Sequence, residues 1–187
     1  MNAPDVVNQR NEWIKNLPKL DKNKLVFLDE SGVNTDFTLI YGRSLGGTRC
    51  VDNIPLNTPK NTTILSSIRL NGETAYITYQ GGTTCEKFKN VLAPTLREDD
   101  IVVMDNMRTH HSKAVKKVIE ELKINVIFLP PYSPDFNPIE KMWSKIKSVL
   151  RKLKIRALSD LKSGVHIAFS KITPNDRAGW FSSRFIG

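Results

Sequence analysis

The sequence Leu25-Val26-Phe27-Leu28-Asp29 joins four apolar residues to an acid, and Ile101-Val102-Val103-Met104-Asp105 repeats the pattern. Short apolar runs bounded by turn signals are typical of strands buried on both faces, as in a sheet covered by helices. A third acid, Glu140, follows Asp105 with 34 residues between them. A carboxylate at the end of a buried strand is costly unless something neutralises it, and three together suit a metal ion. The three acids are therefore a candidate metal site.

The composition limits the classes of protein that could carry such a site. The 187 residues are 40% hydrophobic and 25% charged, as expected for one globular domain with a sizeable core. No stretch approaches the roughly 18 apolar residues of a membrane span, and residues 1–24 lack the apolar segment of a signal peptide. The isolated Cys50 and Cys85 predict neither a disulfide framework nor a zinc site, which favours a reducing cytoplasm.

The net charge of +9 is concentrated after the third acid. Residues 1–140 hold 17 Lys+Arg and 17 Asp+Glu, whereas residues 141–187 hold 11 and 2. Such an excess can be a solvated face that keeps the protein soluble. It can also be a surface that binds phosphates beside the acidic site, and composition alone leaves both interpretations open.

Hydrophobic patterns predict an α/β protein in which strands and helices alternate. We expect strands at 24–29, 62–70, 73–80, 101–105 and 125–129, and helices at 6–17, 83–92, from Ser112, from Pro138 and near 159–170. Asn71-Gly72 predicts a two-residue hairpin, and Thr83 with Glu86 forms a capping box that opens the second helix. Segment 31–61 is unusually long for a connection, which indicates a functional element or a short hairpin within it.

The best-defined helix begins after Asn137, a suitable N-cap that is followed by Pro138 at the first helical position. At about 100° per residue, Glu140, Lys147 and Arg151 share the flank of its buried stripe. We therefore expect Lys147 and Arg151 to hold DNA phosphates beside Glu140. The same role is expected of the other cations in this region, Lys141, Lys145 and Lys154.

Each of the three acids also has a purely structural explanation. Glu140 is the third residue of its helix, where an acid can reach back to the cap backbone and favours the helix dipole. Asp29 could accept hydrogen bonds in a turn with Ser31 and Gly32, and Asp105-Asn106 could be a turn signal. Only the combination of the three acids favours a site over these local explanations.

Other side chains are weaker candidates for the site. Glu30 should point away from Asp29 because strands alternate side-chain direction, whereas Asp135 is the main rival to Glu140. The adjacent His110 and His111 cannot both face one ion from a regular element. Aromatic residues near chain ends more often anchor those ends to the core than stack on bases, and here they are Trp13, Trp180, Phe181 and Phe185.

Three motifs in this sequence belong together. They are Leu28-Asp29-Glu30-Ser31-Gly32, Met104-Asp105-Asn106 with His110 five residues after the aspartate, and Leu129-Pro-Pro-Tyr-Ser-Pro-Asp-Phe-Asn-Pro-Ile-Glu140-Lys-Met-Trp143. In order and spacing they resemble the catalytic signatures of mariner-like DDE transposases, above all the bacterial insertion sequence 630 type. The resemblance extends over roughly residues 25–153.

This resemblance implies an RNase H-like (retroviral integrase-like) fold, a mixed sheet flanked by helices. It divides the chain into a helical extension at 1–23, a catalytic domain at 24–170 and a C-terminal tail at 171–187. Within the catalytic domain, segment 31–61 matches a region that forms a clamp in relatives and reaches toward a partner subunit.

The resemblance also implies the chemistry. Asp29, Asp105 and Glu140 would be the catalytic residues and would bind two Mg²⁺ or Mn²⁺ ions, with Asp29 bridging both ions. Asn106, His110 and Asn137 would support them, and His110 would orient Asp105 or a phosphate. The site would cleave the ends of a transposon and join the freed 3′ hydroxyl to target DNA at a TA dinucleotide.

The chain departs from the family pattern in one respect. Full transposases of this kind carry an N-terminal helix-turn-helix region that recognises the transposon ends, and only about 24 residues precede the first expected strand. We expect an excised catalytic domain or a separate reading frame that binds DNA through phosphates, as a homodimer, in the bacterial cytoplasm. Two other classes stay open: another RNase H-like nuclease such as a junction resolvase, and a regulatory transposase derivative without catalysis.

Overall fold

A five-stranded sheet is the middle layer of the computed structural model, which describes residues 4–56, 60–106, 117, 119–121 and 123–185. The strands are β1 (Leu25–Val33), β2 (Thr62–Arg69), β3 (Thr74–Gln80), β4 (Ile101–Met104) and β5 (Asn125–Phe128). Their order in the sheet is β3-β2-β1-β4-β5. β1 is antiparallel to β2 and parallel to β4, so the sheet is mixed, as the sequence predicts.

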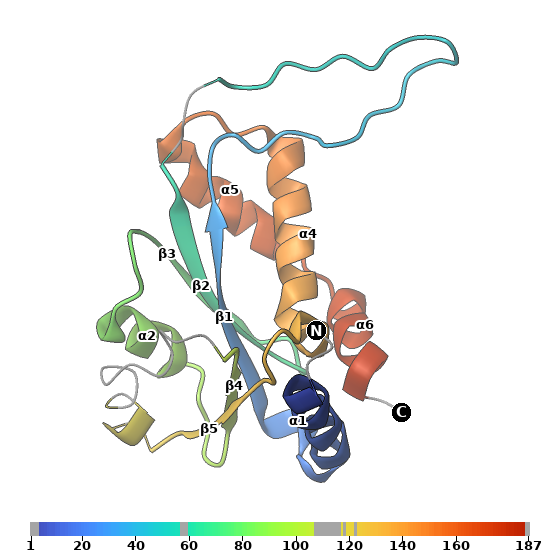
Figure 1. The fold of residues 1–187 in the computed structure, drawn as a ribbon. Helices are drawn as coiled ribbons and strands as arrows, with labels where there is room; N and C mark the ends of the chain where they lie inside the picture. The colour runs from blue at the N-terminus through green and yellow to red at the C-terminus, as the bar shows by residue number, and fades with distance from the viewer. Residues whose placement is uncertain (1–3, 57–59, 107–116, 118, 122, 186–187) are drawn as a thin grey trace.

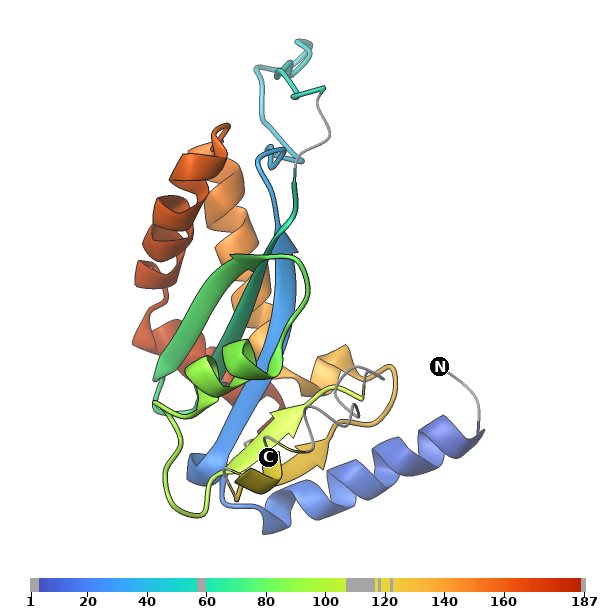
Figure 2. The same ribbon diagram turned by 90° about the vertical axis from the view of Figure 1, so that its left-hand side faces the viewer.

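Helices cover both faces of this sheet (Figures 1 and 2). One face carries α4 (Pro138–Leu153), α5 (Leu158–Ser170) and α6 (Pro174–Phe185), whereas α2 (Cys85–Leu92) covers the other. Helix α1 (Pro4–Asn16) lies along β5. Among the described residues, no helix is both long and apolar enough to cross a membrane.

Both faces of β1 are buried, which explains its continuous apolar run. Leu25 and Phe27 pack into the core under α4, and Val26 and Leu28 pack into the second core under α2. The strand thus separates the two cores. Because its side chains alternate, the residue after Leu28 faces the α4 side again.

β1 continues beyond Asp29 to Val33, so the expected end of the strand at Asp29 is wrong. Asp29 pairs with Ser66 and Val33 pairs with Thr62. The proposed turn at Ser31 and Gly32 is wrong for the same reason: β2 supplies their backbone partners, and this pairing overrides a local turn preference. With the strand continuous, Glu30 points to the face opposite Asp29, as predicted.

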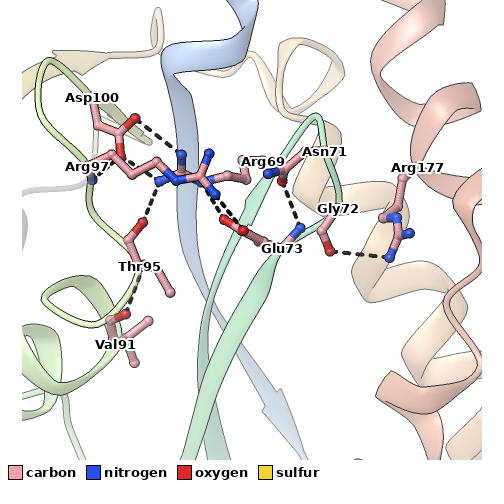
Figure 3. A network of polar contacts seen from close by, with 9 residues as sticks. All are labelled: Arg69, Asn71, Gly72, Glu73, Val91, Thr95, Arg97, Asp100 and Arg177. Atoms are coloured by element: carbon pink, nitrogen blue, oxygen red, sulfur yellow. Dashed lines mark hydrogen bonds and ion pairs between the residues drawn. The ribbon is translucent and has the colours of Figure 1, made fainter.

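The β2–β3 hairpin forms where Asn71-Gly72 predicts it, but its turn is one residue longer than expected. The Arg69 N–H donates to the Glu73 carbonyl at 3.2 Å, which closes a turn of three residues, 70–72. Gly72 has φ +88°, a conformation that favours glycine, and the Arg177 side chain occupies the space that a Cβ would need. The hairpin tip therefore packs against α6 (Figure 3).

A buried ion pair joins this hairpin to the segment before β4 (Figure 3). Arg69 and Asp100 have side chains 2% and 4% exposed, and Arg69 Nη2 lies 2.5 Å from Asp100 Oδ2. The same Nη2 donates to the Thr95 carbonyl at 2.5 Å, and the Arg97 N–H donates to Asp100 at 2.6 Å. Sequence reasoning missed this network, because a cation beside a turn signal is typical of a solvated position.

Helix α2 begins one residue later than the capping box predicts. Thr84, not Thr83, is its N-cap and accepts a hydrogen bond from the Lys87 N–H at 3.4 Å. The Thr83 hydroxyl instead bonds the Tyr79 hydroxyl on β3. The sheet thus holds Thr83 and leaves the next hydroxyl to cap the helix.

Most of the expected C-terminal tail at 171–187 forms α6. Phe181 is 1% exposed, and its ring meets that of Phe27 edge-on at 5.7 Å. Trp13 and Trp180 also pack against the α4 core, so these aromatic residues anchor the chain ends as predicted. The side chain of Phe185 lies outside the described part of the structure.

The expected helix from Ser112 falls mostly outside the described residues. Residues 34–56 and 60–61 project from the sheet in both views and contain no helix or strand (Figures 1 and 2). The short hairpin considered for this segment is therefore not seen in that part of the chain. Arg156 donates to the Thr35 and Phe37 carbonyls at 3.0 Å and holds the base of the segment against the α4–α5 connection.

Candidate active site

The three predicted acids lie in β1, directly after β4 and in the first turn of α4, on the side of the sheet that α4 covers. Phe27 of β1 pairs with Val103 of the parallel β4, and Asp29 and Asp105 each lie two residues further along. This register sets the two aspartates side by side on the same face. Glu140 is in the first turn of α4, which packs on β1. Each of the other two carboxylates raises the pKa of Asp29, so the three charges interact.

Asp29 is 8% exposed, and hydrogen bonds hold both of its oxygens. Its Oδ1 accepts from the Glu30 N–H at 2.7 Å, and its Oδ2 accepts from Trp143 Nε1 at 3.1 Å. Burial is the largest cause that raises the pKa of Asp29 to about 7, and the two hydrogen bonds oppose it. The carboxylate is therefore oriented but carries a desolvation penalty that a cation would relieve.

Glu140 is exposed in the first turn of α4, and the charge of Lys147 acts on it. Partial burial raises its pKa, the charge of Lys147 lowers it, and the charge of Asp105 raises it again. The structural explanation by helix capping gains no support here. A capping acid at Glu140 would accept from the Asn137 N–H, but that N–H donates to the Pro134 carbonyl at 3.1 Å. The Asn137 side chain makes no capping hydrogen bond either, and its buried Oδ1 finds no partner within the described residues.

A cavity of about 370 Å³ lies beside two of the three acids. Asp105 and Glu140 line it together with Asn106, Asn137 and the proline-rich segment 129–134. Two of the predicted supporting residues, Asn106 and Asn137, thus lie at the site. The third, His110, lies outside the described residues, as does His111.

Asp135, the rival to Glu140, is engaged elsewhere. Arg10 of α1 donates to its two oxygens at 2.9 and 2.7 Å and to the Ser133 hydroxyl at 2.7 Å. The Arg10 guanidinium also lies 4.3 Å from the centre of the Phe136 ring. Arg10 therefore fixes the loop that leads into α4. Sequence reasoning missed this residue because its partners are more than 120 positions away.

The donor set fits a hard divalent cation. Among the described residues, no three His, Cys, Asp or Glu side chains are close enough to form a ready-made metal site. The chain instead supplies three carboxylates whose charges repel one another. Oxygen donors of this kind suit Mg²⁺ or Mn²⁺, which retain some of their waters and need few protein ligands.

The predicted DNA-binding cations differ in their surroundings. Lys147 is the one whose charge acts on Glu140, and the Arg151 guanidinium lies 5.3 Å from the centre of the Phe37 ring. The other predicted cations are Lys141, which is exposed on α4, Lys145, which pairs with Asp176 of α6, and Lys154, which pairs with Asp52. Lys147 is therefore the cation best placed to act beside the acids.

Comparison with known proteins gives one family and one fold. A family model described as DDE superfamily endonuclease matches residues 24–162. The chain is similar to the Mos1 mariner paired-end complex with Mg, with a TM-score of 0.80 and 15% identity over 99% of this chain and 60% of that chain. It is also similar to the Mos1 paired-end complex with the left transposon end, with a TM-score of 0.78 and 15% identity over the same shares.

The isolated catalytic domain of Mos1 mariner transposase gives a TM-score of 0.68 at 15% identity, over 96% of this chain and 86% of that chain. At this low identity, the matches establish the fold, an RNase H-like mixed sheet flanked by helices. The chain spans about 60% of the length of the Mos1 protein in the paired-end complexes. No curated protein sequence matches it.

Proposed function

Because the chain belongs to the DDE superfamily of endonucleases, we propose that it is the catalytic domain of a mariner-like, cut-and-paste DNA transposase. The observation that carries the proposal is that Asp29 lies close enough to Asp105 and Glu140 for their charges to act on it, while Asp105 and Glu140 line a cavity. The proposed reaction is metal-dependent cleavage at transposon ends, followed by transfer of the 3′ hydroxyl into target DNA. A TA target and action in the bacterial cytoplasm are part of the same proposal.

Two divalent ions in such a site would activate a water, stabilise charge on the phosphoryl oxygens and support the leaving oxygen. The residues of this chain would hold and orient the reactants. Asp29, Asp105 and Glu140 would supply the oxygen ligands. The cavity of about 370 Å³ beside them has room for the scissile phosphate.

DNA would bind through its phosphates along the cationic side of α4. Burial raises the pKa of Glu140 and the charge of Lys147 opposes that rise, so Lys147 lies near this carboxylate and would meet a phosphate next to the scissile one. Arg151 lies one turn further along the same flank. Because phosphate contacts carry little sequence information, end recognition would depend on a region outside these residues.

Segment 34–61 would contact a second copy of the chain in the DNA complex. Its exposed large apolar side chains include Leu39, Ile40, Tyr41, Leu45, Val51, Ile54 and Leu56. Apolar residues gathered on one projecting segment favour a protein partner. A homodimer is therefore the proposed active form on DNA.

A joining assay tests the function. The chain would be incubated with short duplexes that carry free 3′ hydroxyls, a supercoiled plasmid and Mg²⁺ or Mn²⁺. We expect nicking and joining with the wild type, a loss of at least about 100-fold with Asp29→Asn, and no loss with Asp160→Asn, an exposed acid on α5. Cleavage without joining would instead indicate a nuclease such as a junction resolvase. Full activity of Asp29→Asn would contradict the proposed site.

A further inference from the structure

Trp143 makes a contact that its place in the core does not require. Its indole Nε1–H donates to Asp29 Oδ2 at 3.1 Å, between residues 114 positions apart. Both residues are buried, with exposed fractions of 3% for Trp143 and 8% for Asp29. Burial alone does not produce such a bond, because the buried Nε1 of Trp13 finds no partner within the described residues.

Aromatic contacts fix the orientation of this indole. The Trp143 ring meets the Phe169 ring of α5 edge-on, at 6.5 Å between centroids and 87° between planes. Phe169 is in turn stacked on Tyr76 of β3 at 3.8 Å and 6°. The Tyr76 hydroxyl shares a hydrogen bond of 2.9 Å with His166 Nδ1. Two further elements thus hold the ring that holds Asp29.

The position of Trp143 in α4 links two of the three acids. It follows Glu140 by three residues, so the helix that supplies one carboxylate also holds another by a hydrogen bond. The second oxygen of Asp29 is held by the backbone of its own strand. Each carboxylate oxygen still has a lone pair for a cation.

From this geometry we propose that Trp143 is a positioning residue for the metal site, which fixes the Asp29 carboxylate relative to Glu140. The inference rests on the proposed function, because it assigns to Trp143 a role toward the divalent ions. Partners that orient a ligating carboxylate typically change metal affinity about 10- to 100-fold when they are removed. The competing explanation is that Trp143 only fills the core.

Trp143→Phe separates the two explanations, because it keeps a ring in the core and removes the N–H. Trp13→Phe is the matched control, since it removes an indole N–H that bonds nothing in the described structure. Mn²⁺ binding to the metal-free chain would be measured by isothermal titration calorimetry. We expect about 10- to 100-fold weaker binding for Trp143→Phe and wild-type binding for Trp13→Phe.

Unchanged Mn²⁺ affinity in folded Trp143→Phe would overturn the inference and leave the proposed function standing. Absence of Mn²⁺ binding by the wild-type chain would overturn both. A second measurement on the wild type does not depend on how the variant folds. The chain has three tryptophans, hence three indole N–H signals in a ¹H–¹⁵N spectrum. Mg²⁺ should shift the Trp143 signal most, and binding without that shift would also overturn the inference.

Discussion

At the scale of single residues, the fold buries two acids under different conditions. Asp100 is buried opposite Arg69, so the charges of the two residues compensate each other. Asp29 is buried among carboxylates, and its pKa rises to about 7. Buried charges without compensation are retained where they serve a site. We therefore expect the charge of Asp29 to destabilise the metal-free fold, and we expect loss of the ion pair at Asp100 to destabilise it.

Metal-free protein should lose stability as the pH rises, because of Asp29. Its folded-state pKa of about 7 lies above the ordinary value of 3.8, so the folded state binds this proton more tightly than the unfolded state. The proton then stabilises the folded state at acidic pH, and this stabilisation is lost between about pH 4 and 7. Urea denaturation in EDTA should show a free energy of unfolding about 2–3 kcal/mol lower at pH 8 than at pH 5 from this group.

Asp29→Asn should remove that part of the pH dependence, since the amide does not titrate. It should also raise the stability of the metal-free chain at pH 8, although the amide keeps only one acceptor for its two hydrogen-bond donors. Identical pH profiles for the two proteins would show that Asp29 titrates normally. Added Mg²⁺ should stabilise the wild type more than Asp29→Asn.

Breaking the buried ion pair should destabilise the protein strongly. Arg69→Met leaves Asp100 buried with backbone donors alone, and removing one partner of a buried pair costs about 3–5 kcal/mol. The neighbouring Asp99 is the control, because its pair with Lys24 is exposed and Asp99→Asn should cost less than about 1 kcal/mol. Urea denaturation measures both, and equal losses would contradict the assignment.

At the scale of elements, the apolar pattern of the sequence was sufficient to predict the helices and strands that burial of apolar side chains stabilises. The apolar runs at 25–28 and 101–104 gave β1 and β4, and the stripe after Asn137 gave α4. The strand end at Asp29 could not be predicted, because pairing with β2 extends β1 through residues that locally favour a turn. Local propensity decides boundaries only where no neighbour competes.

In the candidate site, too, local sequence predicts some residues and tertiary packing determines the others. The three acids could be picked from the sequence, because their motifs are contiguous and each follows a recognisable element. Their supports could not, because Arg10 and Trp143 reach partners more than 110 positions away. No local spacing encodes such contacts, and they depend on how α1 and α4 pack.

Helix α6 offers a test at this scale, because its start is a capping box. The Thr173 hydroxyl accepts from the Asp176 N–H at 3.2 Å, and the Asp176 carboxylate accepts from the Thr173 N–H at 2.7 Å. Thr173→Ala should cost about 1 kcal/mol in free energy of unfolding. Ser159→Ala on α5 is the control, since its hydroxyl caps nothing and bonds only the exposed Asp160. An equal loss in the two variants would contradict the cap.

The capping box of α6 also predicts that Asp176 stabilises the fold less at acidic pH. Hydrogen bonds from Lys145 and Thr173 lower the pKa of Asp176 to about 2. A carboxylate whose pKa is lowered in the folded state stabilises the fold when the pH is above its ordinary pKa of 3.8. This stabilisation is lost as the pH falls toward 2. The difference in stability between wild type and Asp176→Asn should therefore shrink below about pH 4, and a constant difference would contradict this linkage.

At the scale of the whole molecule, the net positive charge lies in the C-terminal part of the chain. All of the net +9 falls in residues 141–187, which form most of α4 together with α5 and α6. Lys145 pairs with Asp176, which the net +9 already includes, and Lys154 pairs with Asp52 outside this region, which compensates one of the nine charges. The remaining cations near the acids decide whether the basic side binds DNA or only keeps the protein soluble.

The position of the cations on α4, and not only their total charge, should control the affinity for DNA. Lys147→Glu with Arg151→Glu reverses two charges on the Glu140 flank of α4, whereas Lys152→Glu with Lys162→Glu makes the same change elsewhere on α4 and α5. Since each phosphate contact contributes about 0.9 to the slope of log K against log salt, the first pair should lower the slope by about 2. Fluorescence anisotropy with one duplex, from about 50 to 200 mM salt, measures both pairs. If both pairs weaken binding equally, the excess charge acts only as a general field and the flank of α4 is not the DNA surface.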